Sequence, residues 1–117
     1  MLISAQVQVY ICRERIDLRK SYQGLGLLVQ DVLGLDALSG HLFVFFNKRL
    51  DKVKVLYWDT NGFCLWQKRL EQGCFKVGSF EAAYWQLSLQ QLMMLVAGFD
   101  IRDMKRKVVS NQYVMAK

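Results

Sequence analysis

The sequence predicts an α+β fold: a single domain with an antiparallel β-meander of about four or five strands and two helices packed on one face. Two patterns favour it. Short β-branched and aromatic runs separated by turn residues fill the middle of the chain, and two segments space their apolar residues as helices do. The length of 117 residues and the hydrophobic content of 53% suit one domain with its own core. We expect this domain to span residues 1–117, with a core over about 7–102 and a basic, flexible tail over 103–117.

A strand and a helix are predicted in the N-terminal third. Val7–Cys12 is rich in β-branched and aromatic residues, which indicates a strand. Ser21 is a candidate N-cap for the helix, although Asp17 could start it one turn earlier. Gly34 can adopt the left-handed conformation that ends a helix. The expected buried face has residues at i, i+3, i+4 and i+7, namely Leu25, Leu28, Val29 and Val32.

Three strands are predicted in the middle of the chain. Leu42–Phe46 is wholly apolar, Lys52–Asp59 follows a polar turn, and Phe63–Leu70 returns after Asn61-Gly62. Asn-Gly is the dipeptide that a two-residue type I′ hairpin turn prefers, because both central residues need a positive φ. A turn at these two residues would place Lys54 opposite Arg69 and Trp58 opposite Leu65. Like charges directly opposite each other cost stability, so a bound anion such as phosphate would relieve this pair.

A second helix is predicted near the C-terminus. Ser88 and Gln91 have the spacing of a capping box, and Gly98 is placed to end the helix. A short strand over Ala82–Trp85 is expected before it. The expected buried stripe consists of Leu89, Leu92, Met93 and Val96, widened by Met94 and Leu95.

Neither catalysis nor metal binding is predicted. The single histidine, His41, excludes any site with several histidines. Most of the ten carboxylates lie in turns, at expected helix ends or beside basic residues, as Asp51 does, so they are expected to be ion-paired or solvated. The sequence contains no phosphate-binding P-loop and no nucleophile elbow. We therefore expect no catalytic residue, no metal site and no cofactor.

The cysteines and the N-terminus favour a cytoplasmic protein. Cys12, Cys64 and Cys74 have apolar or aromatic neighbours and are expected to be reduced. Met1–Tyr10 lacks the basic and apolar regions of a signal peptide. Ala82–Phe99 carries no charge but holds four polar side chains, so we expect no membrane span there. The oligomeric state is left open.

Basic residues are the strongest functional lead, because 16 lysines and arginines against 10 acidic residues give a net charge of +6. Tyr57, Trp58 and Trp66 lie near them in sequence and could stack on bases or anchor a protein partner. The residues alone leave nucleic-acid binding and a pure protein-interaction role equally open. Four basic clusters are expected: Arg13, Arg15, Arg19 and Lys20; Lys48, Arg49, Lys52 and Lys54; Lys68 and Arg69; Arg102, Lys105, Arg106 and Lys107.

Several motifs resemble one known family in the same order along the chain. They are Ile16–Lys20 (IDLRK), Gly24-Leu25, Ser39–Phe45 (SGHLFVF), Lys54–Gly73 (KVLYWDTNGFCLWQKRLEQG) and Leu87–Leu92 (LSLQQL). The family is the TnpB accessory protein, the second reading-frame product of bacterial insertion sequences of the sixty-six class. It shares only its name with the RNA-guided nucleases that are also called TnpB.

The resemblance covers about Val7 to Arg102 and implies a setting in DNA transposition. In this family a separate and larger transposase carries the catalytic carboxylates. We therefore expect a non-catalytic accessory factor that binds the DNA ends of the element, the transposase, or both. The alternative is a protein-interaction module without direct nucleic-acid binding. The residues expected to contact phosphate are Arg19, Lys20, Lys48, Arg49, Lys52, Lys54, Lys68 and Arg69, and those expected at a partner interface are Tyr57, Trp58 and Trp66.

Overall fold

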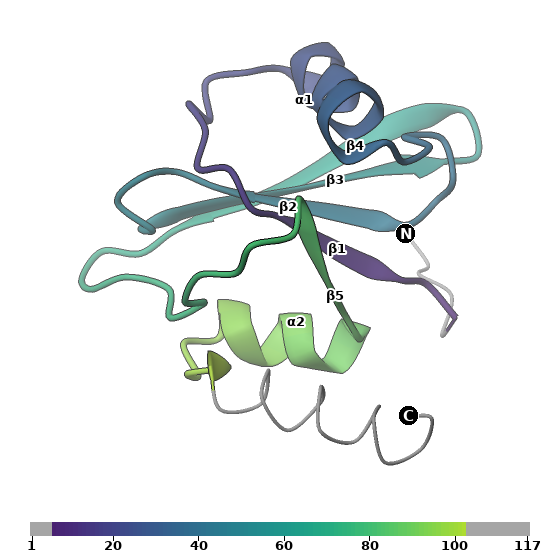
Figure 1. The fold of residues 1–117 in the computed structure, drawn as a ribbon. Coiled ribbons are helices and arrows are strands. Elements are labelled where there is room, and N and C mark those ends of the chain that lie inside the picture. Colours follow the sequence, from purple (N-terminus) through teal and green to yellow (C-terminus); the bar gives the residue numbers. More distant parts are fainter. Residues whose placement is uncertain (1–5, 103–117) are drawn as a thin grey trace.

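The computed structural model describes residues 6–102, which form one five-stranded sheet and two helices (Figure 1). The α+β class and the strand number are therefore confirmed, while the tail expected over 103–117 lies outside the described residues. The elements in chain order are β1 (Val9–Cys12), α1 (Tyr22–Leu28), the π-helical turn η1 (Val29–Leu33), β2 (Leu42–Phe46), β3 (Lys52–Asp59), β4 (Gly62–Arg69), β5 (Tyr84–Leu87) and α2 (Leu89–Val96).

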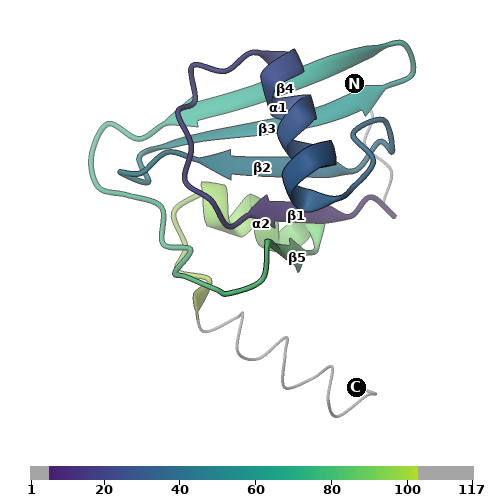
Figure 2. The same cartoon turned by 45° about the horizontal axis from the view of Figure 1, so that its top comes forward.

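The sheet has the strand order β4-β3-β2-β1-β5 and is not a simple meander. β1 pairs with β2 in parallel, because α1 crosses over between them, and the other pairs are antiparallel. The expectation that both helices pack on one face is wrong: α1 covers one face and α2 the other (Figures 1 and 2). The physical reason lies in β2, whose five residues are all buried and need cover on both sides.

Alternating residues of β2 divide the interior into two clusters. Leu42, Val44 and Phe46 belong to the cluster that contains Leu92 and Leu95 of α2. Phe43 and Phe45 point to the other face, where they share a cluster with Leu25 of α1 and Val29 of η1. The central strand thus holds both helices in place.

The first helix departs from its predicted pattern in its last turn. Val32 is 45% exposed, while Leu33 is 6% exposed and belongs to the core, so the prediction that Val32 is buried is wrong. In η1 the Gly34 N–H donates to the Val29 carbonyl, five residues earlier, and this wider turn moves the buried position on by one residue. Gly34 ends the helix with a φ of 68°, as predicted, while Ser21 is the N-cap without a side-chain hydrogen bond.

The β3–β4 hairpin is confirmed, but its register differs by two residues from the predicted one. The loop consists of Thr60 and Asn61, since Asp59 pairs with Gly62. The Asn61 N–H donates to the Asp59 carbonyl at 2.5 Å around Thr60, whose φ is 56°. This γ-turn closes the hairpin one residue earlier than an Asn-Gly turn would. The predicted pairs Lys54–Arg69 and Trp58–Leu65 are therefore wrong; Lys52 faces Arg69, Lys54 faces Gln67, and Trp58 faces Phe63.

The capping box that begins α2 is confirmed. The Ser88 hydroxyl accepts the Gln91 N–H at 3.1 Å, and the Gln91 side chain accepts the Ser88 N–H at 3.0 Å. Gly98 follows the helix with a φ of 104°. Leu92 and Leu95 are buried, whereas Met93 is 61% exposed, so the predicted inward position of Met93 is wrong. The short strand expected at Ala82–Trp85 is β5 and runs over Tyr84–Leu87.

Candidate nucleic-acid interface

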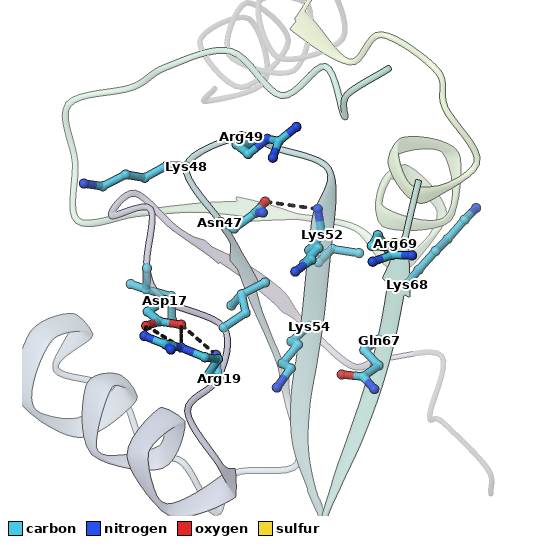
Figure 3. A pocket seen from close by; sticks show the side chains of 13 residues that line it. Asp17, Arg19, Asn47, Lys48, Arg49, Lys52, Lys54, Gln67, Lys68 and Arg69 are labelled. Atoms are coloured by element: carbon cyan, nitrogen blue, oxygen red, sulfur yellow. Dashed lines mark hydrogen bonds and ion pairs between the residues drawn. The ribbon is translucent and has the colours of Figure 1, made fainter. Parts of the chain in front are cut away.

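A concave pocket of about 890 Å³ lies on the α1 side of the sheet, and side chains from three separate segments line it (Figure 3). The segments are residues 16–19, residues 47–54 and the end of β4. We call it the basic pocket, because seven cations and one carboxylate among its lining residues leave a net charge of +6. These charged residues are Arg19, Lys48, Arg49, Lys52, Lys54, Lys68 and Arg69, against Asp17.

The turn between β2 and β3 is built around the side chain of Asn47. Its Oδ1 accepts the N–H groups of Asp51 at 3.1 Å and Lys52 at 3.0 Å, and its Nδ2 donates to the Asp51 carboxylate at 2.6 Å. The last contact lowers the pKa of Asp51, with smaller contributions that include the charges of Arg49 and Lys52. This network holds a turn on which Lys48 and Arg49 are exposed.

The segment 16–19 is fixed beside that turn, because the Ile16 N–H donates to the carbonyl of Phe46 at 3.0 Å. Within it, the Asp17 carboxylate accepts from Arg19 Nε at 2.9 Å and from Arg19 Nη2 at 2.5 Å, and its Oδ1 also accepts the Arg19 N–H at 3.0 Å. These hydrogen bonds lower the pKa of Asp17 to about 2. Arg19 is therefore partly neutralised before any ligand arrives.

The third side of the basic pocket is a pair of like charges at the end of the hairpin. Lys52 and Arg69 are direct cross-strand partners, and Lys54 lies on the same face two residues along β3. The Lys54 ammonium donates to the Lys20 carbonyl at 3.4 Å. Arg69 lies 3.8 Å from Glu71, and both side chains are exposed, so that ion pair is weak.

The structure brings most of the predicted phosphate-contacting residues to one place. Seven of the eight line the basic pocket; Lys20 does not, although its carbonyl lies next to Lys54. Lys68 is oriented differently from the others: its ammonium donates to the Val96 carbonyl at 2.8 Å, toward α2, and in Figure 3 it extends away from Arg69. Lys68 thus lies at the margin between the two faces.

The remaining basic clusters do not join the pocket. Arg13 pairs with Glu14 at 2.8 Å, Arg15 donates to the Gly78 carbonyl at 2.9 Å, and Arg102 pairs with Asp100 at 2.6 Å. The cations at 105–107 lie outside the described residues. Within the part of the chain that the structure describes, the basic residues that converge on the pocket thus come from segments 16–19, 47–54 and 67–69.

The three predicted aromatic residues do not line the basic pocket. Tyr57 and Trp66 point to the α2 side of the sheet, and Trp58 packs edge-on against Phe63 with ring centroids 5.1 Å apart. Tyr57 and Trp66 instead line an apolar groove of about 200 Å³ beside α2, in which Trp66 is 43% exposed. We call this the apolar groove; its other lining residues are Leu42, Val55, Leu89, Leu92, Met93 and Val96.

Sequence reasoning did not assign Asp17, Asn47 and Gln67 to the site. A signal for two of them is present: Asp17 precedes Arg19 by two residues, and Asn47 precedes Asp51 in a polar turn. Across residues 6–102, no group of three or more histidine, cysteine, aspartate or glutamate side chains could hold a metal ion. No helix in the same range is long and apolar enough to cross a membrane.

Comparison with known proteins gives a family match and two relatives. The family model described as "IS66 Orf2 like protein" matches residues 7–106. The uncharacterized protein y4hO of Sinorhizobium fredii is 41% identical over 103 residues, which cover 87% of this chain and 90% of that protein. The uncharacterized protein y4jC of the same organism is 34% identical over 106 residues, 91% of each chain. No solved structure matches the chain.

Proposed function

The chain belongs to the family of IS66 Orf2-like proteins, and from this membership and the basic pocket we propose a non-catalytic accessory protein that binds DNA during transposition. Membership of this family supports a role with the transposition machinery of an insertion sequence. In our proposal the basic pocket contacts the phosphate backbone at the ends of the element. The element's transposase carries out the chemistry, and this protein works beside it in the cytoplasm.

The observation that carries this proposal is the excess of positive charge at one concave site. Across residues 6–102, the side chains of Lys48, Arg49 and Lys52 make no hydrogen bond or ion pair, and Asp51 in the same turn offsets the charges of Arg49 and Lys52 only in part. Cations in excess on one face repel one another, and a polyanion relieves that repulsion while releasing its own counterions. The phosphate backbone of DNA is such a polyanion.

A DNA titration tests the proposal. Fluorescence anisotropy at low salt compares the wild-type protein with Lys52→Glu/Arg69→Glu, using a labelled duplex that carries an end of the element. The matched control is Arg13→Glu/Lys76→Glu, which changes the net charge equally at two exposed positions outside the basic pocket. We expect the pocket variant to lose at least about tenfold in affinity and the control to lose much less. Equal losses in both variants would contradict the proposal.

The apolar groove favours a second candidate function, which is docking on the transposase. Trp66 and Met93 are 43% and 61% exposed beside a groove with apolar walls, and tryptophan and methionine are enriched at protein interfaces. The groove lies on the face opposite the α1 side, so a protein there would leave the basic pocket accessible. In this reading Tyr57 and Trp66 anchor the partner.

A pull-down from nuclease-treated lysate separates the two functions. Tagged transposase should retain the wild-type protein and Lys52→Glu/Arg69→Glu, but should lose Met93→Glu, because the new carboxylate would be buried at the interface without a partner. Met93→Glu should still bind DNA as the wild type does. Retention of Met93→Glu at the wild-type level would argue against docking through the apolar groove.

A further inference from the structure

The basic pocket is concave, which distinguishes it from a flat basic surface. Its volume of about 890 Å³ is bounded on separate sides by the turn at 47–52, the segment 16–19 and the hairpin end. Figure 3 shows Lys48 and Arg49 on one side of the space and Lys54 with Gln67 on another. An anion inside it is therefore approached from several directions, and more than one anionic group has room.

The spacing of cations along β3 and β4 also favours an extended anion. Lys52 and Lys54 lie two residues apart on the same face, which corresponds to about 7 Å along a strand. Arg69, the direct partner of Lys52, adds a planar donor that can hold two phosphate oxygens at once. A single phosphate would satisfy the Lys52–Arg69 pair and leave Lys54 with only its 3.4 Å contact to the Lys20 carbonyl.

The like-charge pair has an energetic consequence. Cations placed directly opposite each other on a sheet destabilise the folded state, and Lys52 and Arg69 have no carboxylate between them; the nearest one that pairs with Arg69 is Glu71 at 3.8 Å. An anion bound between them removes the repulsion and is bound only by the folded state. Occupancy of the basic pocket should therefore raise the melting temperature.

We propose that the basic pocket binds a run of consecutive phosphates from one DNA strand, with Lys52 and Arg69 on one phosphate and Lys54 on the next. This inference rests on the proposed function, because it names the part of DNA that the pocket takes. The chemistry that it recognises is several anionic phosphate groups on one molecule, which free oligophosphate and a DNA backbone both provide. Sulfate and single phosphates lack it.

Inorganic tripolyphosphate, orthophosphate and sulfate at equal ionic strength are the probes. The melting temperature of the wild-type protein should rise with tripolyphosphate at concentrations about tenfold lower than orthophosphate needs. Tripolyphosphate should also displace labelled DNA over the same concentration range. Lys52→Glu/Arg69→Glu should show neither effect, while the Arg13→Glu/Lys76→Glu control should behave as the wild type.

The outcomes separate this inference from the proposed function. Equal shifts with all three anions at matched ionic strength, in a protein that still binds DNA, would overturn the inference and leave the proposed function standing. A melting shift with tripolyphosphate in a protein that does not bind DNA would overturn the assignment to a DNA strand. Equal melting shifts in the pocket variant and the control would show that tripolyphosphate binds elsewhere, which also contradicts the inference.

Discussion

Asp17 is the only acidic side chain among the described residues that line the basic pocket. It accepts hydrogen bonds from the Arg19 guanidinium and from the Arg19 N–H. These bonds hold the conformation of segment 16–19 and offset the positive charge of Arg19. An anionic ligand must compete with this carboxylate for Arg19. At the scale of single residues, Asp17 therefore limits the affinity of the site.

Asp17→Asn should strengthen DNA binding. The amide oxygen can still accept the Arg19 N–H, so the local fold is kept, while one negative charge leaves the pocket. In anisotropy titrations at several salt concentrations, we expect tighter binding and a slope of log affinity against log salt that is steeper by up to about 0.9. Glu14→Gln, which frees Arg13 outside the pocket, is the matched control.

The pH dependence of this effect follows from the pKa of Asp17, which Arg19 lowers to about 2. A carboxylate whose pKa is lowered on folding stabilises the folded state above its unfolded pKa and loses that contribution as the pH falls through the folded value. Asp17 thus stays ionised from about pH 8 to about pH 4. The affinity difference between the wild type and Asp17→Asn should stay constant over that interval, and a difference that vanished there would contradict the ion pair.

Among the secondary-structure elements, two features matter most. The β2–β3 turn shapes the basic pocket, and the end of the first helix determines which residue enters the core. The turn depends on one amide side chain, that of Asn47, for three hydrogen bonds. The first helix ends in the π-helical turn η1, which places Leu33 rather than Val32 at the buried position. Each feature can be tested by a pair of substitutions.

Asn47→Ala should weaken both stability and DNA binding without changing the charge of the pocket. It removes the acceptor for the Asp51 and Lys52 N–H groups, and we expect a loss of about 1–2 kcal/mol in the free energy of unfolding, measured with urea. Gln67→Ala is the control, since Gln67 is an exposed uncharged polar residue of the same pocket; it should cost less than about 0.5 kcal/mol. Equal stabilities would show that the Asn47 network contributes nothing.

Leu33→Ala and Val32→Ala test the π-helical turn. Leu33 is 6% exposed and Val32 is 45% exposed, so we expect urea denaturation to show losses of about 2–4 kcal/mol for Leu33→Ala and less than about 1 kcal/mol for Val32→Ala. A regular α-helix would bury Val32 and reverse the order. The reversed result would therefore contradict the presence of η1.

Local patterns predicted the elements better than they predicted the arrangement. The capping box at Ser88 and the apolar run at Leu42–Phe46 identified their elements because each signal lies within a few residues. Because every residue of that run is apolar, the strand needs cover on both faces. The prediction of two helices on one face overlooked this signal. The hairpin register was predicted two residues off because Asn-Gly favours a turn at residues 61 and 62, whereas the chain turns at Thr60, which adopts a φ of 56°.

The sequence predicted part of the candidate site, but it did not predict how the separate segments come together. A shift of two residues keeps every side chain on its face, so Lys52, Lys54 and Arg69 still lie together despite the wrong register. The approach of Arg19 to the turn at residues 47–52 could not be predicted, because it depends on how the crossover through α1 packs on the sheet. The separation of Trp66 from the cations follows from strand alternation, once the faces are known.

At the scale of the whole molecule, two surfaces of different chemistry lie on opposite faces of one sheet. The basic pocket lies on the α1 side and the apolar groove beside α2. A ligand bound on one of these faces leaves the other face free. We propose that DNA occupies the first of these surfaces.

Chemical-shift mapping distinguishes DNA binding in the basic pocket from binding at the apolar groove. Isotope-labelled protein is titrated with duplex DNA at low salt, and the backbone amide signals are followed residue by residue. We predict that the largest changes fall on residues 17–19, 47–54 and 67–69, with little change along the exposed face of α2 around Met93. Changes concentrated on the apolar groove, or an absence of changes at Lys52 and Arg69 under saturating DNA, would contradict DNA binding in the basic pocket.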